Sequence, residues 1–227
     1  MPTDSTGVFA VLTGDIIGST ELSVDRLEEA RQALARAVGG VRRRRADVVA
    51  GEHEFFRGDA WQLLLADPGW ALRTALMIRA GVRAELDVDT RVAIGVGVVD
   101  HVDLSRISLS TGEAFTLSGR ALDNMTGYFD MTGAVPARAG VLARWLPVTL
   151  HLCSGLVRSW TRRQAEVVAC ALTLEKPTHE AIAKALEPPV KKQTVTDSLS
   201  GANWRTLQEP IDAFEQTDWL AVIGRPE

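Results

Sequence analysis

The chain has 227 residues, of which 46% are hydrophobic and 24% charged, which is typical of a globular protein and excludes wholesale disorder. Its formal net charge of −4, without a long acidic or basic tail, excludes a protein that binds polyanions over its whole surface. The N-terminal residues lack a basic segment followed by an apolar one, and no apolar segment is long enough to span a bilayer. We therefore expect a cytoplasmic protein without a membrane partner.

The first half of the chain alternates between strand and helix patterns. Val8–Thr13 is an unbroken apolar run, which predicts a buried strand, and Leu27, Ala30, Leu34 and Val38 recur at helical spacing. The expected elements are a strand at 8–13, a helix at 24–38, strands at 52–57 and 60–65 around a Gly58-Asp59 turn, a helix at 70–86, a strand at 91–99 and a helix at 115–124. Up to residue 99 the order is β-α-β-β-α-β, which is that of a ferredoxin-like α/β fold.

The second half of the chain is predicted to be helical throughout. Pro136–Trp160 has a wide apolar face, which favours a connecting or dimer helix. Thr161 and Thr178 are suited to cap two following helices, and a third is expected at 193–199 with Val195 and Leu199 inward. This pattern predicts an all-α helix-turn-helix domain, and we divide the chain into residues 1–134, 135–160 and 161–227. Four tryptophans of this half are expected to pack in the core or in a dimer interface: Trp145, Trp160, Trp204 and Trp219.

Two aspartates are the first candidates for chemistry. Asp15 follows the first predicted strand and Asp59 lies in the hairpin turn, so in a ferredoxin-like sheet their carboxylates would meet at one edge. Hard oxygen ligands of this kind suit Mg²⁺ or Mn²⁺ bridged to substrate phosphates. Between the strand and the next helix, backbone N–H groups of Ile17, Gly18, Ser19 and Thr20, with the N-terminus of that helix behind them, are placed to hold a polyphosphate.

Four segments carry a family resemblance: LTGDIIGST, FFRGDAWQLLLADPGWALRTALMIRAGVR, RVAIGVGVV and GEAFTLSGRALDNM. They resemble the motifs of class III nucleotidyl cyclases, and their combination with a C-terminal helix-turn-helix resembles the SatD-like family. The resemblance implies that Asp15, Asp59 and the carbonyl of Ile16 hold the metal ions. It also implies that Arg120 stabilises the leaving pyrophosphate from the opposite subunit of a head-to-tail homodimer.

The sequence also departs from the cyclase pattern. Phe55 stands where the resemblance implies a purine-selecting lysine, and Thr116 stands where it implies a ribose-orienting asparagine. Phe55 donates no hydrogen bond, which weakens the case for cyclisation more than the case for nucleotide binding. Whether the protein is an enzyme stays open.

The third helix of the second half offers a nucleic-acid face. Between Arg158 and Arg205 there are eight Lys/Arg against five Asp/Glu, whereas residues 1–135 hold fourteen against nineteen. The residues expected on its outer face are Lys191, Lys192, Gln193, Thr194, Thr196 and Ser198. The Glu187-Pro188-Pro189 turn is longer and stiffer than the usual turn of DNA readers, so a plain interaction module is the alternative.

The preferred hypothesis is a homodimeric DNA-binding regulator with a cyclase-like sensor domain that binds metal and nucleotide. Ligand at the dimer interface would change the spacing of two recognition helices. Two alternatives remain: an active nucleotidyl cyclase or related nucleotidyl transferase acting on a nucleoside triphosphate, and a catalytically dead dimerisation module.

Overall fold

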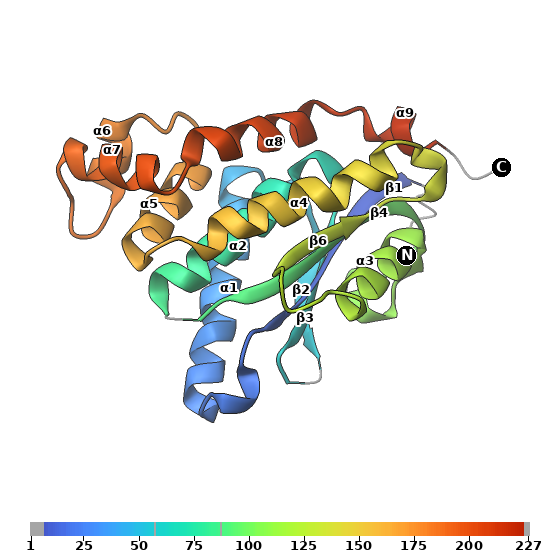
Figure 1. The fold of residues 1–227 in the computed structure, drawn as a ribbon. Helices are drawn as coiled ribbons and strands as arrows, with labels where there is room; N and C mark the ends of the chain where they lie inside the picture. The colour runs from blue at the N-terminus through green and yellow to red at the C-terminus, as the bar shows by residue number, and fades with distance from the viewer. Residues whose placement is uncertain (1–6, 57, 87, 225–227) are drawn as a thin grey trace.

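The computed structural model describes residues 7–56, 58–86 and 88–224, which form a mixed α/β structure around a six-stranded sheet (Figure 1). The strand order is β2-β3-β1-β4-β5, with β6 beside β4. Strand β1 is antiparallel to both of its neighbours, whereas β6 runs parallel to β4. The strands are β1 (Gly7–Ile16), β2 (Val49–Phe56), β3 (Ala60–Leu65), β4 (Thr90–His101), β5 (Thr111–Gly112) and β6 (Met131–Ala134).

Helices cover both faces of the sheet. One face packs against α1 (Val24–Arg44), α2 (Ala71–Glu85) and α4 (Leu142–Arg158). The other face packs against α3 (Glu113–Asp123), whose Ala114 lies in a small cluster with Val11 and Leu64. Because β1 is buried on both faces, its sequence is a continuous apolar run and not an alternating one.

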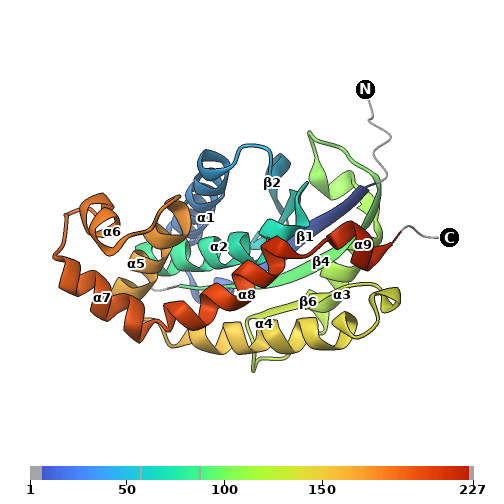
Figure 2. The ribbon, with the colours of Figure 1, turned by 90° about the horizontal axis from the view of Figure 1, so that it is seen from above.

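The C-terminal helices gather at one end of the molecule and then return along it (Figure 2). Helices α5 (Arg162–Thr173), α6 (His179–Ala185) and α7 (Lys192–Gly201) pack on one another, and α5 also lies along α2. Helix α8 (Trp204–Gln216) then passes over α2, and α9 (Trp219–Ile223) contacts β1. Four short 3-10 turns complete the described structure: η1 (Ser19–Glu21), η2 (Pro68–Trp70), η3 (Ile107–Leu109) and η4 (Ala137–Ala139).

One hydrophobic cluster extends from the sheet into the C-terminal helices. It contains Leu12 of β1, Leu76 of α2, Val168 of α5 and Leu207 of α8, all fully buried. The three predicted segments are therefore packed around a shared core, and the division at residues 134 and 160 remains a prediction about folding units.

Several boundaries differ from those expected from the sequence. The first helix runs past Gly39-Gly40 to Arg44, because Val38 and Val41 both bury against the core and packing outweighs the glycines. The helix expected from Pro136 begins only at Leu142, after the η4 turn. Strands β5 and β6 were not expected. Arg57, at the hairpin turn, lies outside the described residues.

Three of the four tryptophans in the helical half are buried, as expected: Trp160, Trp204 and Trp219. Trp145 is instead 62% exposed on α4. Within the described ranges, none of the helices has the length and hydropathy needed to cross a membrane.

Candidate site at the end of strand β1

The structure places Asp15 and Asp59 side by side at one end of the sheet. Asp15 is opposite Ala60 in the β1–β3 ladder, and the backbone N–H of Ile16 donates to the carbonyl oxygen of Asp59 at 3.3 Å. The carboxylate of Asp59 also accepts a hydrogen bond from the hydroxyl of Ser19. The backbones of the two aspartates, distant in sequence, therefore lie close together because β1 and β3 are neighbours.

Arg91 is the residue that sequence reasoning missed. It is the cross-strand partner of Asp15 in the β1–β4 ladder. Its Nε donates to Oδ1 of Asp15 at 2.8 Å, and a second guanidinium N–H donates to Oδ2. The hydrogen bond to Asp15 raises the pKa of Arg91, desolvation opposes the rise, and the charges of Asp15, Asp130 and Asp59 add to it. The pair is partly sheltered, since the side chains of Arg91 and Asp15 are 37% and 17% exposed.

A chain of hydrogen bonds lies behind this pair on the same face of the sheet. Nε2 of Gln62 donates to Oγ1 of Thr13 at 3.2 Å, and Thr13 and Ser118 share a 2.9 Å hydrogen bond between their hydroxyls. The Ser118 hydroxyl also donates to the carbonyl of Phe115 at 3.1 Å. These contacts tie β3, β1 and α3 together and fix the floor of the site.

The loop after β1 is exposed but does not lead directly into α1. The N–H of Ile17 is used by the carbonyl of Asp89 at 3.0 Å, and Gly18 has a left-handed φ of 69°. Helix α1 begins later, at Val24, and its first turn is capped by Ser23, which accepts from the N–H of Arg26 at 3.3 Å. The expectation that the α1 N-terminus stands directly behind residues 17–20 is therefore wrong, because η1 (Ser19–Glu21) intervenes.

The other residues expected at the site lie elsewhere. Phe55 is opposite Trp61 and packs on the α1 side of the sheet, where the guanidinium of Arg31 lies 5.6 Å from its ring centroid. Asp15 faces the other side, so Phe55 cannot join it. Thr116 and Arg120 are exposed on α3, and the Thr116 hydroxyl donates to the carbonyl of Gly112 at 3.3 Å. In the described structure no hydrogen bond or ion pair connects either residue to Asp15 or Asp59.

The donor set does not fit a divalent metal ion in this arrangement. Both oxygens of Asp15 accept from Arg91, and one oxygen of Asp59 accepts from Ser19. A metal ion would compete with a guanidinium that is already held by two hydrogen bonds. Over residues 7–56, 58–86 and 88–224, no three or more His, Cys, Asp or Glu side chains group around a possible metal position.

A cavity of about 550 Å³ connects this loop to the C-terminal helices. Ile17 and Gly18 form one side, and Arg83 of α2 and Arg162 of α5 lie on the others. Nε of Arg162 donates to the carbonyl of Ala84 at 2.7 Å, and a guanidinium N–H of Arg83 donates to the carbonyl of Trp160 at 2.7 Å. The loop after β1 and the start of α5 therefore line the same cavity.

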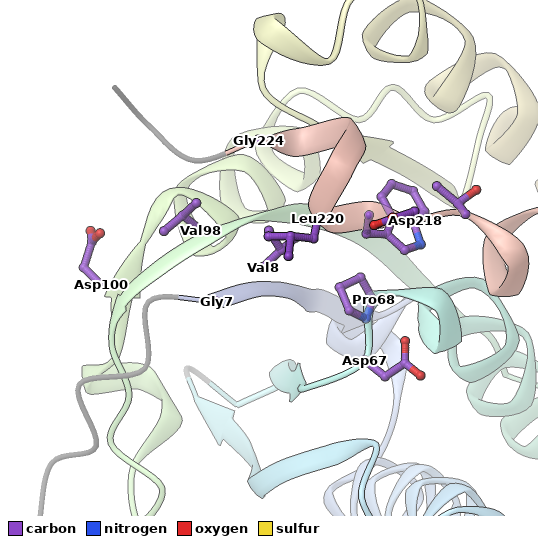
Figure 3. A pocket seen from close by; sticks show the side chains of 11 residues that line it. Gly7, Val8, Asp67, Pro68, Val98, Asp100, Asp218, Leu220 and Gly224 are labelled. Carbon is purple, nitrogen blue, oxygen red and sulfur yellow. The ribbon is translucent and has the colours of Figure 1, made fainter.

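A second cavity, of about 630 Å³, lies at the opposite end of β1 (Figure 3). Its apolar surface comes from Val8, Val98 and Leu220. Two of its aspartates have structural partners: Asp67 pairs with Arg45 at 2.8 Å, and Asp218 caps α9 by accepting from the N–H of Ala221 at 3.0 Å. These contacts account for the carboxylates of Asp67 and Asp218 without a ligand.

Helix α7 presents part of the face predicted to bind DNA. Lys191, Lys192 and Gln193 are exposed, while Val195 and Leu199 are buried as expected. Thr194 is half-buried.

Two residues expected on that face point elsewhere. Ser198 is 8% exposed, since it lies one helical turn after Val195 and beside Leu199 on the inward side. Thr196 is bonded through its hydroxyl to Nδ1 of His179 at 2.9 Å, so it faces α6. The exposed part of the predicted face is limited to the first turn of α7.

No protein-family model and no curated protein matches this chain. Among solved structures, the guanylyl cyclase Cya2 is similar with a TM-score of 0.43 and 15% identity, over 59% of this chain and 77% of that one. A bacterial light-regulated adenylyl cyclase is similar with a TM-score of 0.43 and 16% identity, over 59% of this chain and 44% of that one. Both of these structures are nucleotidyl cyclases, and the second chain is more than twice as long as the part matched.

Proposed function

We propose that this protein is a DNA-binding regulator that contacts DNA through the first turn of α7. The supporting observation is that Lys191, Lys192 and Gln193 are all exposed at the start of this helix. Lysines at this position neutralise phosphates, and a glutamine side chain is able to pair with the edge of adenine. Docking a helix by its N-terminal residues is the geometry of helix-turn-helix proteins.

The helices behind α7 form a rigid support for it. A capping box opens α5, in which Thr161 accepts from the N–H of Gln164 and the Gln164 side chain accepts from the N–H of Thr161. Thr178 caps α6 by accepting from the N–H of Ala181 at 3.1 Å. Ile182 and Val195 are fully buried between the three helices. A fixed scaffold of this kind suits a binding surface that must hold its geometry.

The α/β half is proposed to be a ferredoxin-like, cyclase-derived platform. The order β4-β1-β3-β2, antiparallel throughout, supports this proposal, as does the position of α1 and α2 on one face. We do not propose turnover, because both carboxylate oxygens of Asp15 accept hydrogen bonds from Arg91. The cyclase alternative predicts pyrophosphate release from a nucleoside triphosphate, and detecting it would restore that alternative.

The proposed ligand of this platform is a nucleotide or related phosphate in the cavity beside Ile17 and Gly18. Arg83 and Arg162 line this cavity together with Glu21 and Asp89. Arg83 is paired with Asp89, whereas Arg162 has no ion pair among the described residues, and the cavity reaches the start of α5. A ligand between the two elements would alter how α5, and with it α7, is held. Thermal denaturation with each nucleoside triphosphate tests this. Arg162→Ala should abolish the ligand-induced rise in Tm, whereas Arg163→Ala, which breaks only a surface pair with Glu166, should preserve it.

The homodimer is proposed to form through α4. Four apolar side chains lie on the face of α4 opposite its buried Leu146 and Leu150: Val141, Trp145, Val148 and Leu152. We call these four the α4 stripe. It extends over about 17 Å of helix. A second copy of the chain is the occupant that fits, because an apolar helix face covers itself by two-fold packing.

The area needed by a stable dimer is about 800 Å² per partner. The α4 stripe is smaller than this, but an apolar cavity of about 530 Å³ lies between α3 and α4 on the flank of the same helix. Tyr128, which is 81% exposed, lies in the segment that precedes β6. Together these features extend the apolar surface toward the size that a dimer requires.

DNA binding is tested by fluorescence anisotropy with a labelled duplex of mixed sequence over a range of salt concentrations. Lys191→Ala/Lys192→Ala should weaken binding and reduce the salt slope by about 2, one unit for each lost phosphate contact. Lys184→Ala is the matched control, since this exposed lysine on α6 is paired with Glu180. Unchanged binding by the double variant, or no binding by the wild type, would refute the proposal.

A further inference from the structure

The end of β1 concentrates negative charge around one cation of the chain itself. Asp15 holds Arg91 through two hydrogen bonds, and the charges of Asp59 and Asp130 also act on this guanidinium. Asp130 has further partners of its own, Arg79 at 3.4 Å and Arg158 at 3.3 Å. Arg91 is therefore the cation that balances the pair of aspartates at the strand end.

We propose that the guanidinium of Arg91 is a tethered cation that takes the place of a divalent metal ion beside Asp15. In this arrangement the end of β1 binds neither Mg²⁺ nor Mn²⁺, although it carries two adjacent aspartates. The position is a latent metal site, closed by one side chain of the neighbouring strand.

The sheet register holds Arg91 in this position. Asp15 and Arg91 are directly opposite each other on β1 and β4, in a ladder that runs from Gly7 opposite Val99 to Ile16 opposite Thr90. Directly opposed residues have Cβ atoms about 5 Å apart on the same face of a sheet. Because Arg91 is tethered opposite Asp15, its guanidinium has a high effective concentration at the carboxylate. A metal ion from solution has to displace this cation to bind Asp15.

A metal ion that entered would also meet charge repulsion. It would have to break both hydrogen bonds to Asp15 and would then lie close to the displaced guanidinium, which keeps its charge at any physiological pH. Asp59 offers little in exchange, since one of its oxygens accepts from Ser19. Planar two-point pairing makes Arg91 a stronger competitor than a lysine would be.

One consequence concerns the ligand. A phosphate bound at the Ile17–Thr20 loop would be bound as a free anion and not as its magnesium complex. This consequence rests on the proposed function, whereas the inference about Arg91 stands without it.

The test is Mn²⁺ binding, measured by water-proton relaxation on the full chain. The proteins compared are the wild type, Asp15→Asn, Arg91→Met and Arg91→Met/Asp15→Asn, with thermal denaturation to show that each is folded. Arg36→Met is the matched control, because it removes an exposed arginine that pairs with Glu85. Methionine keeps the length of the aliphatic stem and removes the charge.

We expect the wild type and Asp15→Asn to give the same low Mn²⁺ relaxation enhancement, because Asp15 binds no metal ion in the wild type. Arg91→Met should gain a site at least about tenfold tighter, which the added Asp15→Asn removes and which Arg36→Met does not create. Two results would overturn the proposal: Mn²⁺ binding by the wild type that depends on Asp15, or a folded Arg91→Met protein without the gained site. Neither result depends on whether the protein binds DNA or nucleotide.

Discussion

The fully buried guanidinium of Arg79 on α2 is paired with Asp89, which precedes β4, through Nε–Oδ1 and Nη2–Oδ2 contacts of 3.0 and 2.5 Å. Arg79 also reaches Asp130 before β6 and the hydroxyl of Ser154 on α4, both at 3.4 Å. One side chain therefore connects α2, α4 and two strand starts beneath the site.

Arg79→Met should destabilise the protein by about 3 kcal/mol, because it leaves Asp89 buried with Arg83 as its one ionic partner among the described residues. Urea denaturation followed by circular dichroism measures this free energy of unfolding. Arg36→Met, which breaks an exposed ion pair with Glu85, should cost about 1 kcal/mol or less. A similar small loss for Arg79→Met would contradict a structural role for the buried pair.

Gly14 precedes Asp15 in β1, where it is paired with Trp61 of β3 on one side and with Val92 of β4 on the other. A Cβ atom at this position would lie 2.2 Å from the carbonyl oxygen of Arg91 and 2.5 Å from the ring of Trp61. Gly14→Ala should therefore force β1 and β4 apart and reduce stability by about 1–3 kcal/mol in urea denaturation. Gly119→Ala on α3 is the control. A Cβ there meets nothing within 4 Å, and alanine favours the helix, so stability should hold or rise slightly.

The pairing of β1 with β3, which brings the backbone of Asp15 near that of Asp59, could be predicted from the sequence. The apolar runs and the Gly58-Asp59 turn define the hairpin, and the alternating order of strands and helices limits the possible sheets. The sequence does not predict β5 and β6, because these strands, with 2 and 4 residues, are too short to show a pattern of alternating or continuous apolar residues. Both short strands are stabilised by backbone hydrogen bonds to the longer strand β4.

The chemistry of the site could be predicted less well than the fold. Arg91 lies at the start of an apolar strand, directly after Thr90, and nothing local shows that it faces Asp15, 76 positions away. Only the register of β1 against β4 reveals the pair. Ser198 was wrongly assigned to the outer face of α7 for a related reason: helical spacing defines a stripe, but the neighbouring helices decide how wide the buried stripe is.

Dimerisation through the α4 stripe can be tested by one substitution that introduces a charged side chain. Trp145→Asp should convert the dimer to a monomer in sedimentation velocity, because it places a carboxylate at the centre of the apolar contact. Val24→Asp is the matched control, since Val24 is 84% exposed at the start of α1 and outside the stripe. A wild type that is monomeric at high concentration, or a Trp145→Asp variant that still dimerises, would contradict the proposed interface.

Both cysteine thiols should react with a disulfide reagent much more slowly in the native protein than in the unfolded protein. Burial raises the pKa of Cys153 to about 11, and it also raises the pKa of the half-buried Cys170. At pH 8 both thiols are thus protonated and slow to react with a disulfide reagent. Cys170 should react first, and Cys170→Ser should leave a native protein that is almost unreactive. Rapid labelling of Cys153 in the native state would show that α4 opens locally.

Mild acid should destabilise the protein through its sheltered histidines. The ring of His151 stacks on Phe129, with centroids 3.9 Å apart, and Nε2 bonds to the hydroxyl of Thr132 at 3.0 Å. Desolvation lowers the pKa of His151, and of His53, below the value of about 6.5 expected in the unfolded chain. Between the two values the unfolded state binds more protons, so stability is lost as the pH falls from about 7 toward 5. Across this pH range, the urea midpoint should fall less steeply for His151→Gln than for the wild type. The control His101→Gln, at an exposed position, should follow the wild type. Equal pH dependence of the urea midpoint in all three proteins would show that His151 is not a cause of the acid destabilisation.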